Sequence, residues 1–141
     1  MKYYVGAYAA SPNQTGWDPQ LETAYYNELK QLSNIKGLEH PFLGKLHIHD
    51  DNWFLANIAP QWDYVFTCIP GIMNALGQNP QFGLASTDET GRQAALSFMQ
   101  QACEAIARLT HHLGRQAVTA IQIQTAPARN KADASVQALE Q

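Results

Sequence analysis

Residues 63–69, DYVFTCI, decide the fold class of this chain. Nearly every position in this stretch is apolar, whereas a strand with one face in water alternates apolar and polar residues. A continuously apolar strand is typical of a parallel sheet that is covered on both faces. Pro70 and Gly71 follow and predict the end of the strand. Residues 70–85 contain three glycines and two prolines, and predict a long ordered connection of the kind that is usually functional.

Segments of strand and helix character alternate outward from this stretch. The other predicted strands cover residues 2–10, 35–42 and 118–123. Between them, apolar residues recur every three or four positions, which is the period of a helix that buries one face. The helices are predicted to begin after Asp18, after Asp50 or Asp51, and after Ser86, and a last one covers residues 132–141. Such alternation implies a parallel sheet with right-handed crossovers.

The helix before the last strand carries the clearest end signals. Ser86 and Glu89 stand at capping-box spacing at its start, and Gly114 stops it. His111 and His112 lie in its last turn, where a positive side chain complements the helix dipole. We therefore expect this histidine pair to be structural.

The composition fits one globular domain and argues against several classes of partner. Hydrophobic residues make up 45% of the 141 residues, which is enough for a core. The nine Lys and Arg residues are scattered and the net charge is −3, so we expect neither nucleic acid nor a membrane surface as a partner. No run approaches the roughly 18 apolar residues of a membrane span. Cys68 and Cys103 lie in apolar sequence and predict reduced, buried thiols, so we expect a cytoplasmic protein.

Three segments, taken in order, carry a resemblance to a known family. Residues 37–39 end a strand in Glu39, and residues 84–114 form a helix with Arg92 near its start and Leu113-Gly114 at its end. Residues 118–127, VTAIQIQTAP, supply the next strand. Together they resemble the xylose-isomerase-like TIM barrels, a superfamily of sugar and sugar-phosphate isomerases and epimerases with an abasic-site endonuclease branch. The likeness is greatest to uncharacterised bacterial members that carry a domain-of-unknown-function label.

The resemblance implies an α/β fold that is a partial (β/α) TIM barrel, with about four parallel strands and outer helices. A complete barrel has about 250 residues, so residues 1–141 correspond to a single incomplete domain, the first half of a barrel. For a complete protein it implies metal-assisted proton transfer between adjacent carbons of a carbohydrate, with this fragment inactive alone. Two alternatives stay open: a non-catalytic carbohydrate-binding or assembly module, and a truncated product without independent function.

Polar residues at the carboxyl ends of the strands are the candidates for a substrate pocket, because TIM barrels place their active sites there. These candidates are Tyr8, Glu39, His40, Gln122 and Gln124. Glu39 and His40 can bind a sugar hydroxyl or shuttle a proton, or they can belong to a hydrogen-bond network at the barrel end. Related barrels often end the fourth strand in a histidine. Here that region has glutamines, whose amides cannot act as general bases.

One local cluster resembles a set of metal ligands. His47 and His49 stand two residues apart, a spacing that puts both imidazoles on one face of a strand, and Asp50 offers a carboxylate. The alternative is that the aspartates cap the next helix and the histidines are ordinary loop residues. The superfamily takes its metal ligands mostly from later strands. The resemblance therefore implies no metal site in this chain and a divalent metal in a complete protein.

An incomplete barrel also has consequences for partners. A fourth strand without a fifth has an unpaired edge, and the inner face of an open half barrel exposes apolar side chains. Both features favour a homodimer of halves or pairing with a separate second half. A small carbohydrate is the other expected partner. Trp17, Trp53 and Trp62 can stack on sugar rings, but packing is their commoner role in a chain of this size.

Overall fold

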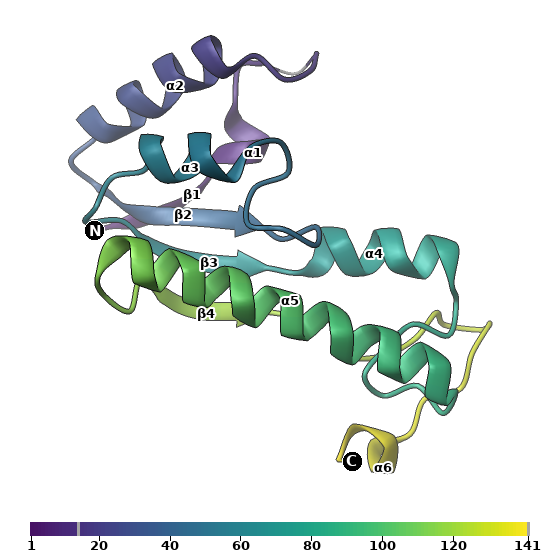
Figure 1. The fold of residues 1–141 in the computed structure, drawn as a ribbon. Helices are drawn as coiled ribbons and strands as arrows, with labels where there is room; N and C mark the ends of the chain where they lie inside the picture. The colour runs from purple at the N-terminus through teal and green to yellow at the C-terminus, as the bar shows by residue number, and fades with distance from the viewer. Residues whose placement is uncertain (14, 141) are drawn as a thin grey trace.

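The chain forms a four-stranded parallel sheet with helices packed along it (Figure 1). The computed structural model describes residues 1–13 and 15–140. The strands are β1 (Tyr3–Gly6), β2 (Ile35–Pro41), β3 (Asp63–Thr67) and β4 (Val118–Gln122), side by side in sequence order. Each neighbouring pair is parallel. The predicted α/β class with four parallel strands is confirmed, and the arrangement is compatible with part of a TIM barrel.

Helices connect these strands, and a further short helix follows the last one. They are α1 (Ala7–Ala10), α2 (Pro19–Gln31), α3 (Asp51–Asn57), α4 (Ile69–Gln78), α5 (Glu89–Leu113) and α6 (Val136–Leu139). Asp18 caps α2 and Asp50 caps α3, each by accepting hydrogen bonds from two backbone N–H groups of the first turn. Gly114 ends α5 with a φ of 64°, a conformation that glycine adopts without strain. In the described residues, no helix combines the length and apolar character that a membrane crossing requires.

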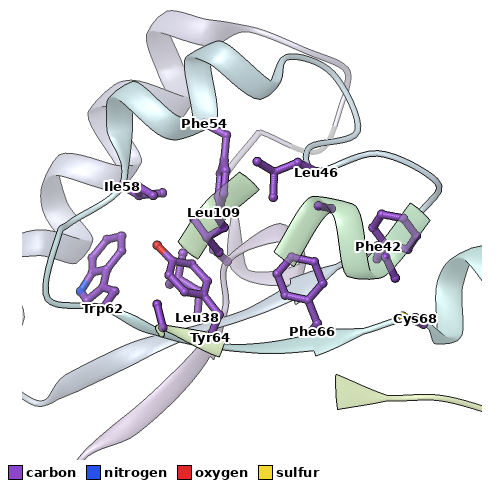
Figure 2. Close-up of a cluster of buried hydrophobic side chains, with 14 of the residues drawn as sticks. Leu38, Phe42, Leu46, Phe54, Ile58, Trp62, Tyr64, Phe66, Cys68 and Leu109 are labelled. Carbon is purple, nitrogen blue, oxygen red and sulfur yellow. The ribbon is translucent and has the colours of Figure 1, made fainter. Parts of the chain in front are cut away.

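The core lies between the sheet and helices α2, α3 and α5 (Figure 1). Alternate side chains of β2 and β3 point toward the helices and are fully buried, including Leu38 and Phe66. Figure 2 shows them meeting Phe54 from α3 and Leu109 from α5. Glu39 and Val65, which alternate with them, lie on the opposite face and are half-buried. The helices therefore cover one face of the sheet.

The sheet is strongly curved. The Tyr4 hydroxyl on β1 lies 3.1 Å from Oγ1 of Thr119 on β4, although β2 and β3 separate these strands. In a flat sheet, strands one and four would stand about 14 Å apart, which is three strand spacings and beyond the combined reach of these two side chains. The sheet must therefore be bent across its strands, which brings β1 and β4 closer together.

The composition of residues 2–10 predicted a single strand, and this prediction is wrong. Strand β1 ends at Gly6, and Ala7–Ala10 form the short helix α1. Period-two and helical patterns cannot be told apart in so short a run of small and aromatic residues. This correction moves Tyr8 from a strand end to a helix above it.

The prediction of a long connection over residues 70–85 is also wrong, because α4 occupies much of it. Strand β3 ends at Thr67, and Pro70 stands in the first turn of α4, where a missing N–H costs nothing. Gly71 permits close packing, since a Cβ there would lie 2.6 Å from the Phe42 carbonyl oxygen. Pro70 and Gly71 therefore belong to α4 and are compatible with its start and its packing.

Three smaller predictions need correction. Asp88, rather than Ser86, caps α5 by accepting from the Gly91 N–H at 2.7 Å, while the buried Ser86 hydroxyl accepts from the Asp88 N–H. The predicted terminal helix over residues 132–141 is reduced to Val136–Leu139, and Gln141 lies outside the described residues. Cys68 is buried as expected, whereas Cys103 faces solvent on the outer side of α5.

Two glycines give a matched test of this packing. A Cβ on Gly37 in β2 would stand 1.7 Å from the Asp63 carbonyl oxygen, whereas a Cβ on Gly77 in α4 meets nothing within 4 Å. We expect Gly37→Ala to lower the free energy of unfolding by about 3 kcal/mol, because the β2–β3 pair must move apart. Gly77→Ala should raise it by about 0.5 kcal/mol through helix propensity. Urea unfolding followed by circular dichroism measures both, and equal effects would contradict the register.

Candidate functional site

A cavity of about 330 Å³ opens at the carboxyl ends of β1 and β2. Helix α1, the α1–α2 loop, the end of β2 and the loop of residues 43–50 form its walls. Its lining includes polar and aromatic side chains from segments far apart in the sequence: Tyr8, Ser11, Asn13, Trp17, Glu22, Tyr26, Glu39, His40, His47 and His49. This is the end of a parallel sheet at which active sites of barrel enzymes lie.

Glu39 and Tyr8 meet over Gly6. A Cβ on Gly6 would stand 3.5 Å from Oε2 of Glu39 and 3.6 Å from the ring of Tyr8, so the missing side chain leaves this space to them. The pKa of the Tyr8 hydroxyl is raised, mainly by burial and also by the negative charge of Glu39. Tyr8 therefore stays protonated and can donate a hydrogen bond, while Glu39 can accept one.

A second carboxylate, Glu22, enters the cavity from the first turn of α2. Its Oε1 accepts a hydrogen bond from the buried Ser11 hydroxyl at 2.7 Å. The Ser11 oxygen also accepts from the Asn13 backbone N–H at 3.1 Å, which shapes the α1–α2 loop. Nδ2 of Asn13 is buried without a hydrogen-bond partner among the described residues. Because buried donors are nearly always paired, this one is available to a ligand oxygen in the cavity that Asn13 lines.

The aromatic wall of the cavity is built around Trp17. Its ring stacks on His49 with centroids 4.6 Å apart and meets Trp53 edge-on at 5.0 Å. Trp53 is held in turn by its Nε1, which donates to Thr23 Oγ1 at 2.9 Å on α2. The third tryptophan, Trp62, is 2% exposed and belongs to the core. Only Trp17 of the three tryptophans lines the cavity among the residues described.

The loop of residues 43–50 is anchored from two sides. His40 Nε2 donates a hydrogen bond to the Leu46 carbonyl, so the other ring nitrogen, Nδ1, is the unprotonated one in the neutral form. Asp51 accepts from the His47 N–H at 2.7 Å and pairs with Arg108 on α5. These contacts position the histidines of the loop against the core and beside Trp17.

Two of the site histidines are neutral at pH 7. Burial lowers the pKa of His40 to about 4, against smaller opposing effects from its Leu46 hydrogen bond and from Asp51. The pKa of His47 is also lowered to about 4, chiefly by burial and further by His40 and His49. His40 lies only 4.4 Å from the Phe54 ring centroid, on the core side of β2. His40 is therefore a buried residue that holds the loop of residues 43–50 through its hydrogen bond to Leu46.

The metal-ligand candidates are already engaged in local contacts. The Nδ1 atom of His47 accepts from the Asp50 N–H at 3.1 Å, and the Asp50 carboxylate caps α3. The capping alternative for Asp50 is therefore confirmed. In the part of the chain that the structure describes, no three His, Cys, Asp or Glu side chains gather in a group that could hold a metal ion. Ligands for the divalent metal that the resemblance implies for a complete protein would have to come from outside these residues.

The fourth-strand candidates lie apart from the cavity. Oε1 of Gln122 accepts from the Thr67 hydroxyl at 3.1 Å, and Nε2 of Gln124 donates to the Ala126 carbonyl at 3.3 Å. The structure thus brings Tyr8, Glu39 and His40 to one cavity and leaves both glutamines outside its lining. Sequence reasoning missed Ser11, Asn13 and Glu22 as lining residues. For Ser11 and Asn13, the position soon after β1 was the available signal, because the loops that follow barrel strands face the active-site end.

Comparison with known proteins assigns this chain to a family. Residues 4–141 match the family described as "Domain of unknown function (DUF4862)". The chain belongs to this family. A relative from Salmonella typhimurium, described as "Uncharacterized protein STM3670", is 32% identical over 126 residues, which cover 89% of this chain and 40% of that protein. The chain thus spans about 40% of the length of the curated relative it matches.

The family assignment bears out the domain-of-unknown-function part of the resemblance drawn from the sequence. No solved structure matches this chain. Membership of the xylose-isomerase-like superfamily goes one step further than the family match, and we treat it below as a proposal.

The buried histidines predict a pH dependence of stability. The unfolded chain takes up protons near pH 6.5, the ordinary value for histidine, whereas folded His40 resists protonation until about pH 4. This contribution to stability is therefore complete above pH 6.5 and is lost as the pH falls toward 4. From pH 7 to about pH 5.5 we expect His40 alone to account for a loss of about 1 kcal/mol in the free energy of unfolding.

The measurement is urea unfolding at both pH values, in wild type and in His40→Gln. Glutamine can still donate to the Leu46 carbonyl but does not titrate, so this variant should lose less stability than wild type. His112→Gln, which changes an exposed residue at the end of α5, is the control and should behave as wild type. A His40→Gln variant with the full pH-dependent loss would contradict the buried neutral state.

Proposed function

We propose that this chain supplies the β1–β2 side of the active-site rim in a carbohydrate isomerase or epimerase with a (β/α) barrel fold. The observation that carries this proposal is the place of the cavity, at the carboxyl ends of parallel strands in a strongly curved sheet. The resemblance of three sequence segments to the xylose-isomerase-like barrels supports the same assignment.

The chemistry of the lining suits a polyhydroxylated ligand. Glu22 and Glu39 accept hydrogen bonds, whereas the Tyr8 hydroxyl and the unpaired Asn13 amide can donate them. Trp17 adds an apolar wall, as expected where sugar rings pack against a protein.

The reaction class follows from the resemblance and from Glu39. An isomerase or epimerase removes a proton from one carbon and returns one to the same or the neighbouring carbon. Glu39 is half-buried at the cavity and is the carboxylate that faces the Tyr8 donor, so it is our candidate for accepting that proton. A divalent metal would need ligands from outside the described residues, and we include no metal-dependent step.

This half of the rim needs a second half to enclose a substrate. The curated relative is longer than this chain, and we propose that a further barrel half, in the same polypeptide or in a partner, covers the open side. The chain alone should bind ligand weakly and catalyse nothing. We also propose a cytoplasmic location, where the buried Cys68 thiol stays reduced.

A non-catalytic assembly role is the second candidate, and the edge of the sheet favours it. Strand β4 is the last in the order, so within the described part of the chain one side of its backbone has no neighbouring strand. Ile121 and Ile123 beside this edge are 41% and 38% exposed. Exposed apolar residues along an unpaired edge promote pairing with another chain.

The functional test is sugar binding by the purified chain. We expect calorimetry with a panel of aldoses and ketoses to find millimolar binding of at least one sugar. Glu39→Gln and Trp17→Ala should weaken it by about tenfold each, because each removes one main contact of roughly 1.4 kcal/mol. Gln124→Ala, outside the cavity lining, is the matched control and should bind as wild type.

Turnover is tested separately with the longer Salmonella relative. In heavy water, an isomerase or epimerase incorporates deuterium at the carbon that loses its proton, and proton NMR detects the lost signal. Exchange into one sugar of the panel would support the enzyme assignment. Binding without exchange would leave the non-catalytic module, and no binding at all would remove both carbohydrate functions.

The assembly candidate has its own test in the oligomeric state of the chain. We expect size-exclusion chromatography with light scattering to give a mass above the 15.6 kDa of the monomer at high protein concentration. Ile123→Lys should shift this mass toward the monomer, because lysine protects an open edge. Leu21→Lys, which changes an exposed apolar residue on α2, is the control. A monomer at every concentration would contradict pairing through β4.

A further inference from the structure

We propose that the cavity selects its ligand by charge: it takes the neutral or amino-bearing end of a sugar and rejects a phosphorylated or acidic one. This inference rests on the proposed function and narrows its substrate class. The resemblance to the superfamily leaves sugars and sugar phosphates open, and the charges around this cavity separate them.

The fixed charges on the cavity wall have one sign. Glu22 and Glu39 both line it, from α2 and β2 respectively. Among the described lining residues there is no lysine or arginine. A phosphate-binding subsite normally offers the opposite, an arginine or lysine that pairs with the anion.

The basic residues of the surrounding elements are engaged elsewhere. Lys45, in the same loop as the lining histidines, donates to the His49 carbonyl and does not line the cavity. Arg108 pairs with Asp51 on the α3 side of that loop. Lys36 pairs with Asp63 near the amino ends of the strands, at the opposite end of the sheet from the cavity. None of these side chains balances Glu22 and Glu39.

The two buried histidines of the wall do not supply the missing positive charge. His40 and His47, with pKa values of about 4, are neutral at the pH where a sugar would bind. His49 is exposed at the mouth and stacks on Trp17. The amino end of α4 approaches the rim at Pro70, but a helix terminus carries about half a positive charge, and two carboxylates outweigh it.

A dianionic phosphate in this cavity would meet two negative groups without a counter-charge. At separations of several ångströms in a partly exposed site, such repulsion weakens binding by about tenfold or more. An ammonium group would be attracted by the same carboxylates. A substrate that carries phosphate would therefore have to direct it away from β1 and β2.

Matched sugars test this selectivity on the purified chain. We would titrate glucose, galactose and mannose, each with its 2-amino and 6-phosphate derivative, at about pH 6.5 and low salt. The expected order of affinity is amino sugar, then neutral sugar, then phosphate, with about fivefold to tenfold between steps. Added salt should compress these differences, since it screens charges at an open cavity. This salt effect needs no variant and therefore does not depend on variant folding.

Substitution then locates the charge. The double variant Glu22→Gln and Glu39→Gln should bring the three affinities closer together, whereas Glu28→Gln, an exposed residue on the same helix as Glu22, should not. A phosphate derivative that binds as tightly as its neutral sugar would overturn the inference and leave the proposed function standing. Absence of binding by every sugar would overturn both.

Discussion

The parallel pairing of β2 with β3 is the constraint on which both the core and the cavity depend. Its register sets Leu38 beside Tyr64 and His40 beside Phe66, so the buried residues of both strands face the same helices. Because side chains alternate along a strand, the same register forces Glu39 onto the opposite face. A slip by one residue would bury Glu39 among aromatic rings and expose Leu38. The apolar core therefore also determines where the acidic group of the site stands.

Much of this architecture could be predicted from the sequence, because strong local signals agreed with the final packing. Residues 63–69 identified the parallel sheet, and the aspartates before α2 and α3 marked their starts. The failures came where a local signal had two physical meanings. Pro70 and Gly71 end a strand in isolation, but here they begin α4 and let it approach the Phe42 carbonyl. A glycine that allows a close contact can be recognised as such only when the group that it contacts is known.

The site was predicted less completely than the fold. Glu39 lies near the end of β2 and Tyr8 follows β1, the neighbouring strand, so the rule that active sites gather at strand ends was sufficient to pair them. Gln122 and Gln124 obey the same rule but end the fourth strand, and they bond to neighbours outside the cavity. Trp17 and the acceptor Glu22 depend on the path of the α1–α2 loop and on the first turn of α2. The path of a loop leaves no periodic pattern in the sequence, so the approach of these two residues to the cavity could not be predicted.

The core and the site differ in how complete they are within this chain. Helices α2, α3 and α5 cover one face of the sheet and bury its aromatic residues, so the chain can hold its shape through its own packing. The cavity, by contrast, has walls from the β1–β2 side, and no helix of the described residues covers the opposite face of the sheet (Figure 1). Catalysis on a carbohydrate needs water excluded from the reacting carbons, which one wall cannot do. Under the proposed function, binding and turnover are therefore separable: this chain would set which end of a sugar enters, and whatever closes the β4 edge would supply the rest of the chemistry.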